Sequence, residues 1–417
     1  MKKLLLVATI VACSLMSAQA NATYLSRVNQ VLQSNIESYN SSLVGFGLKG
    51  TGRTESTNAL NYIVQKYKDF GYADSQITYD NFTYNTKAVK NVIITKTGTV
   101  YPDQYVIICG HYDSYYGTTT GTRSVGANDN GTGVATIMEI ARILKDVPTE
   151  YSIKFIHFTG EEQGLLGSKN FVTNVVNSTT PKMKIRLVFN IDMIGGVASQ
   201  TNNSIFCEAD RLPNADGSFN ATGTTTGTKT TNDLASYNFT VALKNYVGYY
   251  STLAGVFSYA YNSDYMPFEN NGEIVLGFYE RPTNTSTGAV VDPNPYYHKN
   301  TDIATNMSFP YVYQITKAAL GAMQHFAVAS TSTTLGVSDI DKVKDFDLFP
   351  SPAKEVININ LDSSVKEFSF EISDINGRKI STTKNKRQID TSDLKPGVYI
   401  GTIESEKGKA SKKFIIK

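Results

Sequence analysis

Two adjacent acidic residues, Glu161 and Glu162, follow an apolar run in the segment HFTGEEQGLLGS. Residues 151–158, which precede this pair, are rich in β-branched and aromatic types, as is typical of a buried strand. Neighbouring carboxylates repel each other, and a carboxylate close to a buried strand also loses hydration. The pair therefore predicts that a positive charge lies nearby.

Further residues of metal-binding type fall just after predicted strands or in turns. His111 and Asp113 follow YVIICG, and Asp192 ends KIRLVFNID. Asp129 lies in the glycine-rich turn GANDNGTG, and His298 lies in the loop NPYYHKNTD. Imidazole and carboxylate groups suit zinc. One His, one private carboxylate and one shared Asp per metal are enough for two ions about 3.5–4 Å apart, as in hydrolytic two-metal sites. Such ions would supply the charge that the glutamate pair needs.

Each of these residues also has a purely structural interpretation. A single His after a strand is more often a satisfied polar residue than a ligand. Asp129 could cap a helix or close a turn, and Glu161 and Glu162 could lie in a solvated loop. Their joint occurrence favours a metal site. The other two of the four histidines, His157 within a strand and His325 on a helix, are expected to be structural.

Strands and helices that could position these residues alternate along the chain, which favours an α/β fold with a mixed, largely parallel sheet sandwiched by helices. Ligand sites on such sheets gather at the carboxyl ends of the strands. Residues 21–85 read as helices with polar loops, and 214–230 as a surface loop. Strands are expected at 90–95, 104–110, 151–159, 185–191, 203–207 and 273–279, and helices at 58–70, 132–145, 164–176, 231–246 and 310–328.

The composition excludes some partners and predicts others. The chain has 417 residues and a net charge of +2, so nothing indicates nucleic acid as a partner. Lys2 and Lys3, an apolar segment and the ending Ala18-Gln19-Ala20 predict a secretory signal peptide over residues 1–20; acylation of Cys13 is the alternative. We therefore expect a secreted or cell-surface protein.

Two cysteines follow the predicted signal peptide. Cys109 lies in a strand-like run, where a buried free thiol is the expected state, although an oxidising compartment would permit a disulfide with Cys207.

The last quarter of the chain differs in composition. Residues 331–344 form a small, polar linker, which closes a catalytic domain expected over 21–330. Short alternating segments over residues 345–417, among them VININL, FSFEISD and KKFIIK, predict a small β-sandwich.

Six ordered blocks across residues 90–305 resemble secreted aminopeptidases with two co-catalytic zinc ions, of the zinc-exopeptidase clan MH. The blocks are GHYDS, GANDNGTG, FTGEEQGLLGS, NIDMIG, SDYMPF and NPYYHKNTD. The resemblance implies two Zn²⁺ per chain and peptide substrates with a free N-terminus. It also implies that His111 and Asp192 bind one ion, that Glu162 and His298 bind the other, and that Asp129 bridges them.

The same resemblance implies roles for three further residues. Glu161 would be the general base, Asp113 would orient the imidazole of His111, and Tyr297 would donate a hydrogen bond to the developing oxyanion. A cis peptide bond is implied between Asp129 and Asn130. This chain departs from the family at Tyr265, where Ser-Asp-His is the usual form, and that departure puts the pocket shape in doubt.

Residues 345–417 resemble the sorting domain of the type IX secretion system, with Pro350-Ser351-Pro352 in place of the commoner Pro-Asn-Pro. The resemblance implies contact with a secretion machinery and export across an outer membrane. A generic carbohydrate- or protein-binding β-sandwich is the alternative.

Two other functions fit parts of the pattern. A glutaminyl-peptide cyclotransferase shares the fold and several of these blocks but uses one zinc; the intact turn Asn128–Gly131 favours the aminopeptidase. A non-catalytic surface binding protein would have no use for an unliganded base such as Glu161 beside its metal.

Overall fold

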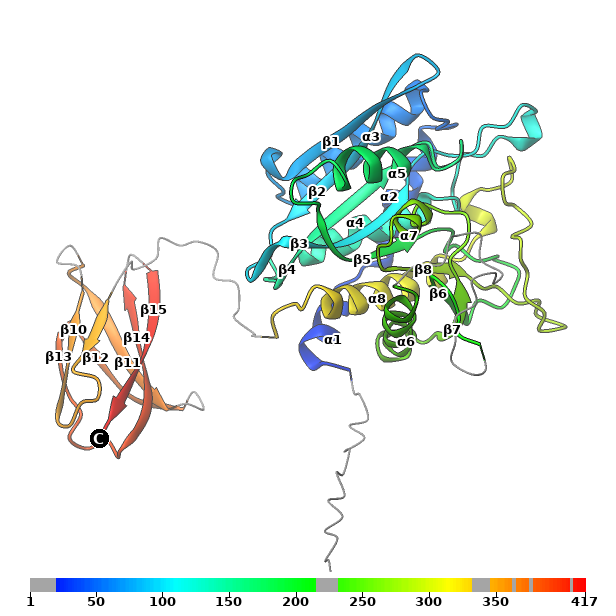
Figure 1. The fold of residues 1–417 in the computed structure, drawn as a ribbon. Helices are drawn as coiled ribbons and strands as arrows, with labels where there is room; N and C mark the ends of the chain where they lie inside the picture. The colour runs from blue at the N-terminus through cyan, green and yellow to red at the C-terminus, as the bar shows by residue number, and fades with distance from the viewer. Residues whose placement is uncertain (1–19, 215–231, 332–345, 362–364, 375–377, 406–407) are drawn as a thin grey trace, which may run out of the picture. The chain divides into compact units, whose positions relative to one another are not determined.

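The computed structural model describes residues 20–214, 232–331, 346–361, 365–374, 378–405 and 408–417 (Figure 1). The chain forms two compact units that divide at Thr333 and Thr334. All but the last residue of the predicted signal peptide, nearly all of the predicted 214–230 loop and most of the predicted linker lie outside the described residues. Within the described residues, no helix has both the length and the apolar character needed to cross a membrane.

The first unit is built on an eight-stranded mixed sheet with the strand order β1-β2-β4-β3-β5-β8-β6-β7. The four central strands, β4, β3, β5 and β8, run parallel, whereas β2 is antiparallel to β4 and β6 is antiparallel to β8. The predicted mixed, largely parallel α/β sheet is thereby confirmed. The strands are β1 (Ile77–Tyr84), β2 (Lys87–Lys96), β3 (Tyr101–His111), β4 (Tyr151–Phe158), β5 (Lys184–Ile191), β6 (Ser204–Ala209), β7 (Ala254–Tyr259) and β8 (Val275–Glu280).

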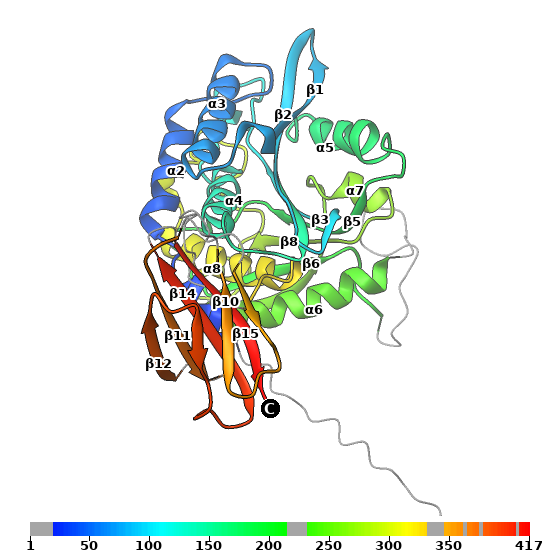
Figure 2. The same cartoon turned by 90° about the vertical axis from the view of Figure 1, so that its left-hand side faces the viewer.

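Helices cover both faces of this sheet (Figure 2). Side chains alternate between the two faces: Val106 and Ile108 of β3 pack in one core cluster, whereas Ile107 packs in the other. The first cluster includes residues of α1 (Ala22–Val28), α2 (Gln33–Gly45), α3 (Thr54–Asp69), α4 (Gly131–Leu144), α6 (Asp233–Tyr250) and α8 (Phe309–Phe326). The second includes residues of α5 (Leu166–Phe171), of the π-helical turn Val172–Val176 and of α7 (Met266–Asn270).

The expectation of helices throughout residues 21–85 is wrong for Ile77–Tyr84, which forms β1. This strand pairs with β2 through a two-residue turn, in which Asn85 has φ 44° and Thr86 has φ 64°. Such turns usually contain glycine, and its absence removes the sequence signal for a hairpin. The short elements β7 and α7 were also not expected from the sequence.

The second unit is a β-sandwich, as predicted. Its two antiparallel sheets enclose a common apolar core that includes Ile357, Phe370, Ile403 and Phe414. One sheet contains β9 (Asp347–Phe349), β10 (Val356–Asn360) and β13 (Gln388–Asp390). The other contains β11 (Phe368–Asp374), β12 (Lys379–Lys384), β14 (Gly397–Ser405) and β15 (Gly408–Ile416).

Candidate metal centre

The predicted ligand residues meet at the carboxyl edge of the parallel strands. His111 ends β3, while Glu162 and Asp192 closely follow β4 and β5. Asp129 lies two residues before α4, and His298 lies between β8 and α8 with φ 57°. Five residues from five separate segments are thus brought together, as expected for a site at this edge.

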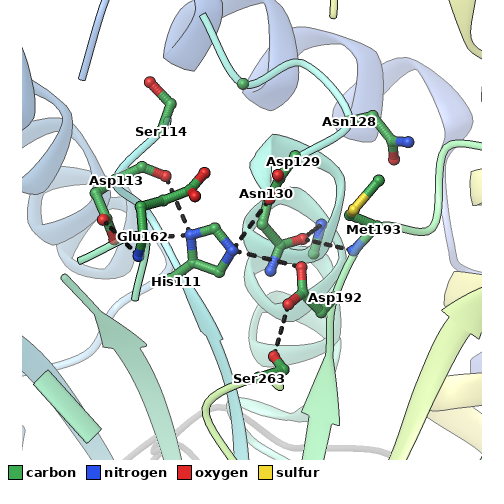
Figure 3. Close-up of polar contacts among 12 residues, drawn as sticks. His111, Asp113, Ser114, Asn128, Asp129, Asn130, Glu162, Asp192, Met193 and Ser263 are labelled. Atoms are coloured by element: carbon green, nitrogen blue, oxygen red, sulfur yellow. Dashed lines mark hydrogen bonds and ion pairs between the residues drawn. The ribbon is translucent and has the colours of Figure 1, made fainter. Parts of the chain in front are cut away.

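The two carboxylate oxygens of Asp129 face two different histidines. Oδ1 lies 3.2 Å from Nε2 of His111, and Oδ2 lies 3.5 Å from Nε2 of His298. His111 Nε2 also lies 3.4 Å from Asp192 Oδ1, and His298 Nε2 lies 2.9 Å from Glu162 Oε2. Figure 3 shows the His111 side of this arrangement. Two histidine–carboxylate pairs therefore share one aspartate.

The orientation of the His111 ring follows from Asp113. Nδ1 of His111 lies 3.1 Å from the backbone oxygen of Asp113 and 3.6 Å from its Oδ1, and both atoms are acceptors. Nδ1 therefore donates to Asp113, and Nε2, which points toward Asp129 and Asp192, is the nitrogen available to a metal ion. Asp113 is held in turn, because its Oδ2 accepts hydrogen bonds from Thr51 Oγ1 at 3.0 Å and from the Glu162 N–H at 3.4 Å.

Two aromatic rings hold His298. Its ring stacks on Tyr115 with a centroid distance of 3.8 Å and an interplanar angle of 4°. It also stacks on Tyr297, at 3.7 Å and 27°. Two rings at these distances cannot share one face, so His298 lies between them. Tyr115 was not singled out from the sequence, although it directly follows the GHYDS block.

The centre carries excess negative charge that the side chains alone do not neutralise. Glu162 Oε1 and Asp192 Oδ1 are buried and accept no hydrogen bond within the described residues. Burial raises the pKa of Glu162 well above its usual value, and the neighbouring Asp129 and Glu161 raise it further. Burial would lower the pKa of His111, but Asp192, Asp113 and Asp129 outweigh it and raise this pKa well above its usual value. A cation at this point would neutralise the carboxylates.

These donors fit zinc in type and in orientation. Single ligand atoms of His111, Asp129 and Glu162 lie within 4.8 Å of one another. In this set His111 and Glu162 belong to different histidine–carboxylate pairs. His111 lies close to Asp192, and Glu162 lies close to His298. Imidazole nitrogens and carboxylate oxygens are zinc ligands. The residues therefore fit a zinc centre.

The loop that carries Asp129 is fixed by two buried acids that sequence reasoning missed. Asp302 accepts hydrogen bonds from the backbone N–H groups of Asn128 and Asp129, at 2.7 and 3.2 Å. Glu280 accepts a hydrogen bond from Nδ2 of Asn128 at 2.9 Å. Asp302 lies in the same block as His298, and Glu280 ends β8, so a systematic search of acids at strand ends would have found Glu280.

The peptide bond between Asp129 and Asn130 is cis. The side chain of Asn130 caps α4, because its Oδ1 accepts a hydrogen bond from the N–H of Gly133 at 3.0 Å. On the other side of the centre, Ser263 donates a hydrogen bond to Asp192 Oδ2 at 2.6 Å (Figure 3). These bonds hold Asp129 and Asp192 in place from outside the centre.

A cavity of about 390 Å³ opens beside the centre, and Glu161, Asp129, Asp192, Tyr297 and His298 all line it. Burial raises the pKa of Glu161 well above its usual value, and the nearby charge of His111 opposes this shift. Tyr297 thus both stacks on His298 and lines the cavity. The remaining histidines lie elsewhere, as expected: His157 and His325 each form a 2.9 Å hydrogen bond with a tyrosine hydroxyl.

Cys109 and Cys207 are both buried free thiols, as expected for Cys109. Neither belongs to the residues that surround Asp129.

Solved structures share this fold. The LapA aminopeptidase of Legionella pneumophila aligns over 73% of this chain and 74% of its own, with a TM-score of 0.56 and 17% identity. An aminopeptidase of Aneurinibacillus sp. strain AM-1 aligns over 73% of this chain and 96% of its own, with a TM-score of 0.54 and 16% identity. A glutaminyl cyclase of Bacteroides thetaiotaomicron aligns over 70% and 97%, with a TM-score of 0.50 and 18% identity. The chain therefore shares its fold with these aminopeptidases and with this glutaminyl cyclase.

The sequence profile of peptidase family M28 matches residues 91–323, and the chain belongs to that family. A profile of the secretion system C-terminal sorting domain matches residues 347–417. Aminopeptidase YwaD of Bacillus subtilis is 36% identical over 113 residues, which are 27% of this chain and 23% of the relative. A probable zinc metalloprotease of Pyrenophora tritici-repentis is 28% identical over 211 residues, 44% and 48% of the two chains. The chain thus spans less than half the length of these relatives.

Proposed function

We propose that this protein is a zinc-dependent aminopeptidase that removes N-terminal residues from peptides, with two Zn²⁺ per chain. The observation that carries the proposal is Asp129, whose two oxygens face two separate histidine–carboxylate pairs. Membership of peptidase family M28 supports a peptidase, and similar proteins are described as an aminopeptidase and as probable zinc metalloproteases.

In this proposal His111 and Asp192 would hold one ion, Glu162 and His298 would hold the other, and Asp129 would contribute to both. When bound, such ions anchor a free amine, polarise a carbonyl and lower the pKa of a water. Glu161 lines the same cavity and, as the general base, would accept a proton from the attacking water and return it to the leaving amine. The raised pKa of Glu161 suits a group that must both accept and release a proton.

Two further residues serve the reaction by position. Asp113 fixes the tautomer of His111, so that Nε2 stays available as a ligand. Tyr297 lines the cavity beside Glu161, and its hydroxyl donates a hydrogen bond to the oxyanion that forms on the scissile carbonyl. Its ring also packs against His298, so loss of the ring would cost more than loss of the hydroxyl alone.

We also propose a domain organisation for the chain. Residues 1–20 are a signal peptide, 21–330 the catalytic domain, 331–344 a linker, and 345–417 a type IX sorting domain that contacts a secretion machinery. The sorting-domain profile over residues 347–417 supports secretion or display at the cell surface.

A glutaminyl-peptide cyclotransferase with one zinc is the second candidate, since one neighbour in fold is a glutaminyl cyclase. An aspartate between two histidines disfavours it, because one ion would leave one of the two pairs without a cation. A non-catalytic binding protein is disfavoured by Glu161, a half-buried acid that lines the cavity beside the centre.

The test combines metal content with activity on purified protein. Two zinc ions per chain, with release of leucine from a chromogenic leucine amide, support the proposal. One zinc with cyclisation of an N-terminal glutamine selects the cyclotransferase. Glu161→Gln should keep both ions and lose about 10²- to 10⁴-fold in kcat; full activity in this variant would refute the proposed base.

A further inference from the structure

The cavity beside the metal centre continues along one face of the sheet, over β6 and β8. Tyr279 and Phe206 face each other across these strands and both line the cavity. Two residues further along, Gly277 and Glu208 face each other, and Glu208 lines the cavity as well. Because two residues of a strand span about 6.6 Å, Glu208 lies well below the level of Phe206.

Glu208 occupies a position where an apolar residue would be expected. Its neighbours along β6, Ile205 and Cys207, point to the opposite face and are fully buried in the main core. Glu208 itself is 7% exposed. Burying a carboxyl group costs free energy unless its oxygens are paired, so packing alone does not explain this residue.

A single side chain in the described part of the protein donates a hydrogen bond to this carboxyl group. The hydroxyl of Tyr265 lies 2.6 Å from Glu208 Oε2, and the same hydroxyl accepts a hydrogen bond from the N–H of Tyr261 at 2.9 Å. Tyr265 is the residue that departs from the family's Ser-Asp-His block. Gly277 makes room for the pair, because a Cβ there would lie 2.7 Å from the Tyr265 ring and 2.8 Å from Glu208 Oε2.

The cavity is acidic, and among the described residues that line it His298 at the metal centre is the one basic residue. Asp292 also lines it, and among the described residues no Lys or Arg does. Arg281 stacks on the Phe206 ring but hydrogen-bonds with Ser204, four positions from Glu208 along β6. Burial raises the pKa of Glu208 to about 8, and the nearby Asp192 and Asp292 raise it while the Tyr265 hydroxyl opposes the shift. A cationic side chain entering the cavity would favour the charged form of Glu208.

The walls suit a long side chain with a cationic end. They include aromatic rings and a thioether, from Met193, Phe206, Tyr259, Tyr261 and Tyr279. Such surfaces cover the methylene groups of Lys or Arg, and aromatic faces also attract their charge.

We propose that this cavity receives the side chain of the substrate's N-terminal residue, and that Glu208 selects a basic residue, arginine or lysine. The inference rests on the proposed aminopeptidase function and adds its substrate class. The alternative is a purely structural role, in which Glu208 only positions Tyr265. A glutamine at position 208 would still accept the Tyr265 hydrogen bond but would carry no charge, so this substitution separates the two roles.

The experiment compares kcat/KM for arginine and citrulline p-nitroanilides, whose side chains have nearly the same shape but differ in charge. The unmodified enzyme should prefer arginine by about 10-fold or more, as a hydrogen bond to a charged group provides. In Glu208→Gln this ratio should fall toward one. Tyr265→Phe, which keeps the carboxylate, should retain the preference for arginine. Lysine and norleucine p-nitroanilides repeat the comparison for an ammonium group.

A matched control is Glu273→Gln, because Glu273 forms an ion pair with Lys182 at 2.6 Å and does not line the cavity. It should leave both rates unchanged. Equal rates for arginine and citrulline in the unmodified enzyme would overturn the inference while leaving the aminopeptidase intact. An arginine preference that survives in Glu208→Gln would also overturn it. If no amino-acid anilide is hydrolysed, the proposed function fails and the inference with it.

Discussion

Two groups of buried carboxylates lie at the same end of the sheet, and they differ in what surrounds their oxygens. Glu280 and Asp302 each accept three hydrogen bonds from N–H or O–H groups. Glu162 and Asp192, by contrast, each keep a buried oxygen with no donor in the described structure. Burial raises the pKa of Glu280 to about 7 and that of Asp302 to about 6, so burial alone does not distinguish the two groups.

The two groups differ in the number of hydrogen-bond donors around their carboxylate oxygens. A buried carboxylate surrounded by N–H and O–H donors is stabilised by the protein and can support a loop. A buried carboxylate that faces only other acceptors needs a cation from outside. By this criterion Glu280 and Asp302 support the loop, and we propose that Glu162 and Asp192 are ligands of the metal ions.

The largest expected effect is that of Asp129→Asn. The amide keeps the shape of the side chain but removes the charge shared between the two histidine pairs. We expect less than two zinc ions per chain and a loss of about 10³-fold or more in kcat/KM, because a metal ion supplies several kcal/mol of charge stabilisation. Metal analysis and kinetics on one preparation check both quantities. If the variant still bound two zinc ions tightly, the charge of Asp129 would not be needed to hold them, and its proposed role would be wrong.

Asp302→Asn makes the same chemical change in the supporting group, and a smaller effect is expected. Its amide would present an N–H₂ group to backbone N–H donors of Asn128 or Asp129. The Asp129 loop would shift, and zinc affinity should fall about 10- to 100-fold, as for other residues that hold ligands in place. Activity should return in excess zinc. Titration with zinc in a chelator buffer measures this; activity that stays absent at saturating zinc would move Asp302 into the catalytic group.

Substitution of Tyr115 tests how His298 is held and should have a weaker effect. Tyr115→Leu removes one of the two stacked rings, whereas Tyr115→Phe keeps it. Since an aromatic pair contributes about 0.5–1.5 kcal/mol, we expect a loss of about 2- to 10-fold in affinity for one zinc ion in the leucine variant alone. Equal losses in both variants would instead assign the effect to the Tyr115 hydroxyl.

How far the sequence could predict this centre depends on the kind of residue. Short blocks such as GHYDS identified the two histidines and the carboxylates Glu162 and Asp192, which meet at the Asp129 side chain, because most of these residues follow strands that end at one edge of the sheet. Glu280, Asp302 and Tyr115 were missed, because their roles depend on contacts between segments far apart in the chain. The strand β1 was missed for a local reason, the turn at Asn85 and Thr86 without glycine. Glu208 could not be found either, since a lone acid in a strand gives no sign of the face to which it points.

The smallest effect on catalysis is expected for substitution of His157, a histidine that lies away from the metal centre. Burial lowers the pKa of His157 to about 3, and its Nε2 forms a hydrogen bond with the Tyr67 hydroxyl. The unfolded chain would bind a proton there near pH 6.5. Because this pKa is lower in the folded state, His157 costs no stability above pH 6.5, and stability falls as pH drops below that value. The expected loss is about 2 kcal/mol between pH 7 and pH 5.

Denaturant unfolding of the unmodified protein and of His157→Gln at both pH values measures this slope. Loss of zinc at low pH affects both proteins alike, so the difference between them isolates the contribution of His157. The variant should lose the extra pH dependence, while its kcat at pH 7 should remain close to that of the unmodified enzyme. If the free energy of unfolding changed with pH equally in both proteins, His157 would take up its proton in the folded protein as readily as in the unfolded chain. The proposed difference between the tyrosine-bonded histidines and the proposed metal ligands would then be wrong.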